Sequence, residues 1–215
     1  AFAIESLTRA QRAIDEGLNS KDITPVTIKT RRGEHTVTVD EQPHKANLDK
    51  IPQLRPAFAE GGTITPANSS SISDGASALL LASESAASAH GLTRRARIVA
   101  HARNSLAPES FTLAPIGATE QVLEKASWTA SDVDLWEINE AFAMVTMLTT
   151  RALDLDPACV NVHGGACAQG HPVGSTGSRI IVTLIHALEH YGKKRGVAAL
   201  CIGGGEATAM AVELI

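Results

Sequence analysis

The sequence predicts an α/β fold in which helices cover a mixed sheet. From Arg97 to Leu214, short apolar runs alternate with longer segments of helical period, an order typical of sheets layered with helices. The runs consist mostly of alanine, valine, isoleucine and leucine, because aromatic residues make up only 3% of the chain. Two glycine-dense stretches, 164–177 and 201–205, interrupt them. They indicate loops, since glycine destabilises the interior of helices and strands.

The first third of the chain has less regular patterns. Apolar residues recur every three or four positions over 4–14, which predicts a helix that ends at Gly17. Residues 23–30 and 35–40 have strand-like composition and are separated by a short polar turn, so they predict a hairpin. Residues 41–67 show no sustained period and are expected to be irregular. The chain begins inside the first helix without a methionine, which is typical of a truncated or cleaved product.

The remaining elements follow in a regular order. Strands are expected at 74–83, 97–102, 133–138, 159–162, 196–202 and 206–214, and helices at 83–90, 115–127, 140–153 and 176–191. From residue 97 onward the order is therefore βαβαβαββ. It places Asn139, His171 and Cys201 in loops at strand ends. In an α/β sheet such loops meet at one edge, where ligands commonly bind.

Composition narrows the class of function. The net charge of −4 and the lack of a long basic run give no reason to expect nucleic acid as a partner. No stretch approaches the roughly 18 apolar residues of a membrane span, and no signal-peptide pattern opens the chain, so no membrane is expected. Three cysteines without paired spacing indicate a reducing compartment, with the cytoplasm as the default, and argue against disulfides or a metal site.

Three polar residues in or beside these loops are candidates for chemistry. His171 is framed by glycines and fixed by Pro172, so it is a candidate general base or oxyanion donor, the alternative being a structural histidine. Cys201 ends an apolar run just before three glycines, and the alternative there is a small buried hydrophobe. Asn139 lies between a strand and a helix that it could merely cap.

Together, the motifs around these residues resemble the C-terminal half of the thiolase family, in particular acetyl-CoA acetyltransferases and 3-ketoacyl-CoA thiolases. The motifs are Asn-Glu-Ala-Phe-Ala (139–143), Gly-Gly-Ala-x-Ala-x-Gly-His-Pro-x-Gly-x-x-Gly (164–177) and Cys-Ile-Gly-Gly-Gly (201–205), preceded by Leu-Arg-Pro-Ala-Phe (54–58), Gly-Thr-Ile-Thr-Pro-Ala-Asn-Ser-Ser (62–70) and Asp-Gly-Ala-Ser-Ala (74–78). The resemblance implies three parts. Residues 1–68 would be the C-terminal part of a loop domain that grips coenzyme A, 69–92 the last strand and helix of the N-terminal domain, and 93–215 a complete C-terminal domain.

The resemblance also implies roles for the candidate residues. His171 matches the histidine that activates a nucleophilic cysteine and directs an N–H at a thioester oxygen. Cys201 matches the cysteine that exchanges the α-proton, and Asn139 matches the asparagine that holds a water beside the same oxygen. The backbone N–H of Gly203 matches a donor of the second oxyanion hole. Removal of a weakly acidic α-proton requires a soft base of lowered pKa and a stabilised enolate, and a thiolate near an imidazole would supply that base.

Contacts with coenzyme A carry over from the resemblance as well. Ser70 matches a serine that bonds the pantetheine arm, and Phe58, Ala141 and Phe142 match residues that line it; the alternative is that these are ordinary loop and core residues. His44 and Lys45 stand where many members carry an arginine that faces the phosphates. Coenzyme A thioesters are then substrates, no resident cofactor is implied, and the full-length enzyme is expected to be a homo-oligomer, a dimer or a tetramer.

The family's nucleophilic cysteine belongs to a segment that has no counterpart in this sequence. Neither Cys159 nor Cys167 lies in a matching context, so we expect this chain to be inactive alone. The resemblance implies that the helix at 4–14 covers a domain that this sequence does not contain. Its apolar face is therefore expected to be disordered or buried against another copy of the chain. One alternative is an isolated, non-catalytic C-terminal domain. Another is a ketoacyl synthase or a sterol-carrier-type thiolase, but synthases carry a histidine at the position of Cys201 and carrier-type thiolases replace the Asn-Glu-Ala-Phe motif.

Overall fold

The computed structural model describes residues 1–215 and contains a four-stranded sheet in its C-terminal part. Its strands are β3 (Ala96–Ser105), β4 (Leu135–Ile138), β5 (Arg195–Cys201) and β6 (Glu206–Leu214), and they lie side by side in the order β3-β6-β5-β4. β6 pairs antiparallel with both β3 and β5, whereas β4 pairs parallel with β5. The predicted mixed sheet is therefore confirmed.

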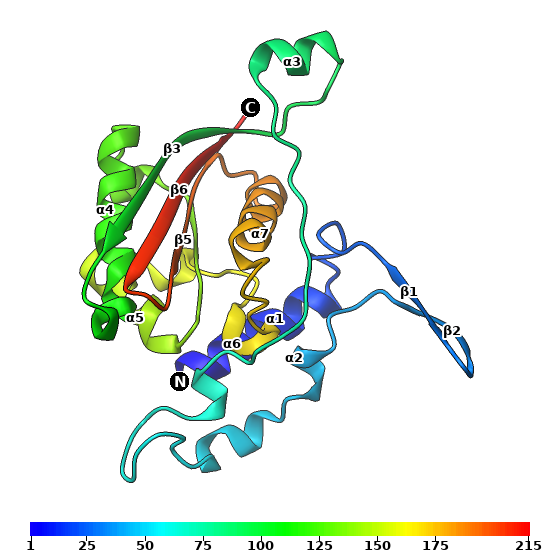
Figure 1. Ribbon diagram of the computed structural model, residues 1–215, viewed down its shortest axis with the longest axis vertical. Helices are drawn as coiled ribbons and strands as arrows, with labels where there is room; N and C mark the ends of the chain where they lie inside the picture. Colours follow the sequence, from blue (N-terminus) through cyan, green and yellow to red (C-terminus); the bar gives the residue numbers. More distant parts are fainter.

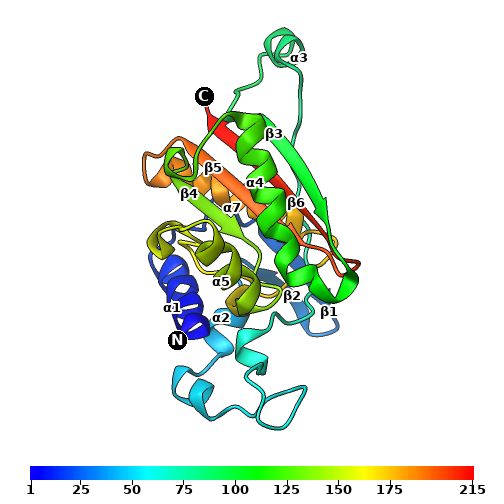
Figure 2. The ribbon, with the colours of Figure 1, turned by 90° about the vertical axis from the view of Figure 1, so that its left-hand side faces the viewer.

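Helices cover both faces of this sheet. Helices α4 (Ala114–Ala126) and α5 (Ala143–Ala152) lie on one face and α7 (Thr176–His190) lies on the other (Figure 1). Side chains alternate between the faces along each strand. In β5, Val197 and Ala199 join the core beneath α4, while Ala198 joins the core beneath α7. Figure 2 shows α4 lying along the sheet. The small strand side chains let the helices approach closely on either side.

One of the predicted strands is reduced to a single pair. At 159–162 the structure has a short 3-10 helix (Pro157–Cys159) and one parallel bridge between Trp136 and Val160. The strand prediction is wrong here because Asn161 adopts a left-handed conformation with φ of 48°, which turns the chain away after one pair. A short helix, α6 (Ala166–Gln169), then leads into the loop before α7.

Helix α1 (Phe2–Asp15) packs on the same chain, contrary to the expectation that it would be disordered or cover another copy. Leu7 and Ala10 form a small core with Ala168 of α6. The Arg9 guanidinium donates a hydrogen bond of 2.6 Å to the Val160 carbonyl. The expectation was wrong because α6 supplies an apolar surface that its four residues do not reveal in the sequence.

Residues 41–67, between α1 and α3, are mostly irregular, as predicted. The hairpin of β1 (Val26–Thr30) and β2 (Gly33–Val37) is confirmed, and both of its faces are largely exposed where it projects from the body (Figure 1). The other elements are α2 (Gln42–Lys45), two 3-10 helices (Leu48–Gln53 and Pro66–Asn68) and α3 (Glu84–Ala89). None of the helices has the length and apolar content needed to cross a bilayer.

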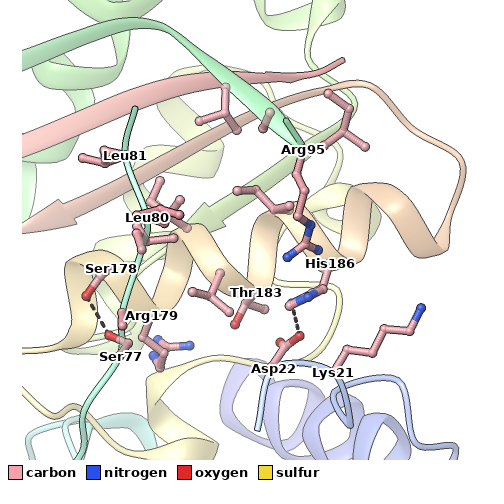
Figure 3. A pocket seen from close by; sticks show the side chains of 18 of the residues that line it. Lys21, Asp22, Ser77, Leu80, Leu81, Arg95, Ser178, Arg179, Thr183 and His186 are labelled. Carbon is pink, nitrogen blue, oxygen red and sulfur yellow. Dashed lines mark hydrogen bonds and ion pairs between the residues drawn. The ribbon is translucent and has the colours of Figure 1, made fainter. Parts of the chain in front are cut away.

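The strand predicted at 74–83 does not form. Residues 74–82 run alongside α7 without a backbone hydrogen bond, and the side chains of Leu80 and Leu81 are 81% and 71% exposed. A strand needs a neighbouring strand to pair with, and none lies beside this segment. Its main attachment is the Ser77 hydroxyl, which hydrogen-bonds the Ser178 hydroxyl on α7 at 2.6 Å (Figure 3).

A buried carboxyl on the face of the sheet covered by α7 makes stability depend on pH. Burial raises the pKa of Glu137 from 4.5 to about 8, so the folded state binds this proton more tightly than the unfolded state. The free energy of unfolding should therefore fall as pH rises from about 5 to about 8. Glu137→Gln removes this contribution. We expect the variant to gain on the order of 3 kcal/mol relative to wild type across that range, measured by urea unfolding at several pH values. Parallel pH curves for the two proteins would contradict this.

Candidate active site

Two of the predicted site residues lie at the same edge of the sheet, at the ends of neighbouring strands. Ile138 of β4 pairs with Ala199 of β5, and the Asn139 N–H continues the ladder with a bond of 2.9 Å to the Ala199 carbonyl. Cys201 is the last residue of β5, two positions further on. Parallel pairing of the strands thus brings Asn139 and Cys201 together from positions far apart in the sequence.

Asn139 is buried with both polar atoms of its amide unpaired. The side chain is 2% exposed, and neither Nδ2 nor Oδ1 has a hydrogen-bond partner in the protein. The residue does not cap α5, whose N-cap is Phe142. An unpaired buried amide is costly, so this side chain is suited to hold a water or a ligand atom.

Cys201 is a protonated thiol at neutral pH. Burial raises its pKa to about 11, and no hydrogen bond joins its sulfur to an imidazole. The expectation of a thiol with lowered pKa is therefore wrong for this arrangement. The thiol form can still donate a proton to a developing carbanion, and it can act as a base when a substrate or a neighbouring group takes its proton.

His171 is held at its backbone and at its ring. Its N–H donates to the Ser71 carbonyl at 3.0 Å, and its Nδ1 lies 2.7 Å from the Thr176 hydroxyl. Because that hydroxyl donates its own proton to the Pro172 carbonyl, it accepts from Nδ1–H. The lone pair is then on Nε2. Burial, and secondly the Arg179 guanidinium, lower the pKa of His171 and favour the neutral ring.

Gly203 lies in the exposed turn between β5 and β6. Its N–H makes no hydrogen bond within the chain, and no atom lies within 4 Å of the position that a Cβ would occupy. The N–H is therefore free to meet an oxyanion. Packing requires glycine at Gly205 instead, where φ is +99° and a Cβ would lie 2.3 Å from the Leu106 carbonyl oxygen.

The four residues expected to contact coenzyme A form one cluster next to this edge. The Ser70 N–H and hydroxyl both donate to the Ala141 carbonyl, each at 3.0 Å. The rings of Phe58 and Phe142 meet edge to face with centroids 6.3 Å apart, and Phe58 is 73% exposed. Since Ser71 accepts the His171 N–H, residues 70 and 71 join this cluster to the histidine.

A large cavity of about 1890 Å³ lies elsewhere in the molecule. It is bounded by residues 76–82, α7 and the segment that contains Asp22, which contacts His186 (Figure 3). None of the four predicted catalytic residues lines it. No cluster of three or more His, Cys, Asp or Glu side chains is arranged to hold a metal ion.

Two residues that shape the site lie inside the sequence motifs but were assigned no role there. Thr176 sets the tautomer of His171, and Glu140 accepts three hydrogen bonds behind Asn139. Glu140 could have been noticed only as the residue after Asn139. The candidate residues offer a neutral imidazole with a free Nε2, a thiol, an unpaired amide and a free backbone N–H, and paired strands join two of them, Asn139 and Cys201. These are the groups needed to move a proton next to a carbonyl while stabilising its oxygen.

Comparisons with known proteins agree on one family. The model of the thiolase C-terminal domain matches residues 92–214, and that of the thiolase N-terminal domain matches residues 1–85. A probable acetyl-CoA acetyltransferase of Dictyostelium discoideum is 48% identical over 213 residues, which are 99% of this chain and 51% of that protein.

Solved structures share the fold. The crystal structure of a Bacillus anthracis acetyl-CoA acetyltransferase has a TM-score of 0.95 and 41% identity, covering 99% of this chain and 54% of that one. A thiolase of Ascaris suum, solved in complex with coenzyme A, has a TM-score of 0.88 and 38% identity, covering 100% and 55%. The chain spans about half the length of the relatives it matches. With both family models matched along it, the chain belongs to the thiolase family.

Proposed function

We propose that this chain supplies the acid–base half of a thiolase that transfers acyl groups between coenzyme A thioesters by Claisen condensation or thiolysis. The observation that carries the proposal is the hydrogen bond from His171 Nδ1–H to Thr176, which leaves Nε2 free to take a proton. The similarity to proteins named acetyl-CoA acetyltransferases supports this reaction.

In the proposed thiolysis direction, His171 Nε2 accepts the proton of a nucleophilic thiol, which then attacks the ketone of a 3-ketoacyl thioester. The carbon–carbon bond breaks, and Cys201 gives its proton to the departing α-carbon. In condensation, Cys201 first gives its proton to the coenzyme A thiolate that is released when the nucleophile is acylated. As a thiolate, it then removes a proton from the α-carbon of the second thioester. Two donors stabilise the enolate oxygen: a water on the unpaired Asn139 amide, and the Nε2–H of His171 once that nitrogen has accepted the thiol proton. The Gly203 N–H stabilises the tetrahedral oxyanion.

The proposed substrates are coenzyme A thioesters, and no resident cofactor takes part. The cluster of Ser70, Phe58, Ala141 and Phe142 supports this because it joins an exposed aromatic ring to the loop of His171. The coenzyme A complex of the Ascaris thiolase gives further support. The Ser70 oxygen can still accept a hydrogen bond from the pantetheine arm, although its proton is donated to Ala141.

We also propose that the chain does not turn over alone, because none of its three cysteines is placed to accept an acyl group. Such a cysteine must be accessible and readily ionised. Burial and the neighbouring Glu140 carboxylate raise the pKa of Cys167 far above its usual range. Burial also raises that of Cys201 to about 11. Cys159 ends the 3-10 helix at 157–159 and contacts none of the candidate site residues by hydrogen bonding.

The alternative is a non-catalytic domain that folds but takes no part in acyl transfer. The unpaired amide of Asn139 favours the enzyme, since a purely structural site would pair these buried atoms. We further propose a homo-oligomer, a dimer or a tetramer, on the family resemblance, which light scattering would test. A cytoplasmic location is supported by the free state of all three cysteines.

The proposed function is tested in a chimera that joins to this chain the part of the Dictyostelium relative outside the matched region. Cys201→Ala should slow exchange of the α-protons of acetyl-CoA in D₂O by about 100-fold, as for loss of a general base. It should slow acyl transfer to the nucleophilic thiol much less. Cys159→Ala is the matched control and should leave both steps unchanged. Equal loss of both steps in Cys201→Ala would make Cys201 structural, and an inactive chimera would contradict the proposed function itself.

A further inference from the structure

Glu140 is a buried carboxylate that joins four separate segments of the chain. It is 1% exposed. Its Oε1 accepts from the Asn161 amide at 2.9 Å, and its Oε2 accepts from the Ser6 hydroxyl at 2.7 Å and from the Cys167 N–H at 3.1 Å. All three partners are donors, which is the set that a carboxylate satisfies. Glu140 therefore holds α1, the turn at Asn161 and the start of α6 against the loop that follows β4.

Two of these segments carry candidate catalytic residues. Asn139 directly precedes Glu140, and His171 lies four residues after Cys167, beyond the end of α6. A shift of the Cys167 N–H away from the carboxylate would move α6, and His171 would move with it. Glu140 thus links the position of Asn139 to that of His171, in addition to the bonds from Ser70 to Ala141 and from His171 to Ser71.

The backbone opposite Glu140 is shaped to admit it. At Gly165 a Cβ would lie 2.3 Å from the carboxyl carbon of Glu140, although the backbone there is extended and would accept any residue. The Gly165 N–H donates to the Ser6 hydroxyl at 3.0 Å, so that hydroxyl links Glu140 to the glycine-rich loop a second time. The absence of a side chain at residue 165 is explained by the carboxylate alone.

We propose that Glu140 is a positioning residue, which fixes the His171 loop relative to Asn139 and so sets the geometry of the candidate site. It acts through Cys167 and Gly165 and touches no substrate itself. The proposal takes the roles of Asn139 and His171 from the proposed function, but the contacts that carry it are independent of any activity.

The structure offers a matched control in Glu137. This glutamate lies three residues earlier, is also buried, and has no hydrogen-bond partner at Oε1. Because its pKa is raised to about 8, it is protonated at neutral pH, and glutamine imitates it closely. Glu140→Gln is equally conservative in shape, but it replaces an acceptor oxygen by an NH₂ group that faces donors.

The first experiment is hydrogen exchange on the full chain at pH 7. Glu140→Gln should speed exchange in residues 164–171 by about 10- to 100-fold, the loss expected for one hydrogen bond to a charged group. Exchange in α4 and β6 should stay unchanged in Glu140→Gln, and Glu137→Gln should not speed exchange in residues 164–171, because its higher stability can only slow it. Gly165→Ala should reproduce the effect of Glu140→Gln, since it displaces the same carboxylate without altering it.

The second experiment separates positioning from stability alone. Long-range ¹H–¹⁵N spectra report the tautomer of His171, which should change from Nδ1–H toward a mixture in Glu140→Gln and stay unchanged in Glu137→Gln. In the chimera, kcat should fall at least about 10-fold, with KM changed little, because misplaced catalytic groups lower transition-state binding. Ser6→Ala, which leaves the Cys167 bond in place, should lower stability but keep the His171 tautomer.

A wild-type His171 spectrum and wild-type exchange at 164–171 in Glu140→Gln would overturn the proposal, as would equal effects from Glu137→Gln. If Glu140→Gln does not fold, Glu140→Asp tests the same contacts with the charge retained. An inactive wild-type chimera would contradict the proposed function, while the exchange and spectral results would still decide the role of Glu140.

Discussion

His171→Ala is expected to lower kcat of the chimera by at least about 100-fold in both thiolysis and condensation, as for the loss of a general base. The variant removes the Nε2 that would activate the nucleophilic thiol and the N–H that would meet the enolate oxygen. Because His171 takes part in both thiol activation and enolate stabilisation, thiolysis and condensation should both be slowed. KM for coenzyme A thioesters should change little, because the cluster around Ser70 is left intact. Steady-state assays in each direction would measure the loss.

The matched control for this prediction is His90→Ala. His90 is an exposed histidine at the end of α3 and makes no side-chain hydrogen bond. It should retain wild-type rates, which rules out a general effect of replacing a histidine. Turnover of His171→Ala near that of wild type would show that another group acts as the base.

The chain by itself is expected to show no thiolysis of acetoacetyl-CoA, with activity at least about 1,000-fold below that of the chimera. Covalent catalysis divides the reaction into two steps through an acyl-enzyme, and the three cysteines of this chain are buried or lie away from the site. Folding should be unaffected, so far-UV circular dichroism and hydrogen exchange would show a structured sheet in the same inactive sample.

Adding the part of the Dictyostelium relative outside the matched region as a separate polypeptide tests whether the chain is competent. Recovery of turnover on mixing would show that the acid–base groups are in place and lack only a nucleophile. Turnover of acetoacetyl-CoA by the isolated chain, with iodoacetamide treatment abolishing it, would contradict the prediction and identify one of its own cysteines as the acyl acceptor.

Local patterns predicted most of the fold. The apolar runs at 133–138, 196–202 and 206–214 became β4, β5 and β6, and Pro115 lies in the first turn of α4 as expected. The predictions failed where the structure of a segment depends on its contacts with other segments. Residues 74–83 have the composition of a strand but no strand beside them. At 159–162 the single conformation of Asn161 ends the pairing.

The residues of the candidate site also fall into two groups, those that the sequence predicts and those that it does not. Asn139, His171 and Cys201 could be predicted because glycines and strand ends mark them in the sequence. Thr176 and Glu140 could not, since their roles depend on contacts between segments that fold together. The Ser6 hydroxyl meets Glu140 across 134 positions of the chain. The pKa of Cys201 was predicted in the wrong direction because burial of the thiol, the alternative that the apolar run before it indicated, dominates that pKa.

The unpaired stretch 74–82 adjoins Ser71, whose carbonyl accepts the His171 N–H. Fixing the backbone of each residue costs about 1–2 kcal/mol of conformational entropy, and no backbone hydrogen bond in this stretch offsets that cost. A polypeptide that added a strand alongside Leu80 and Leu81 would fix this backbone before a substrate arrives. Substrate would then lose less entropy on binding. Binding of such a polypeptide and binding of substrate would then be thermodynamically coupled, and each would strengthen the other.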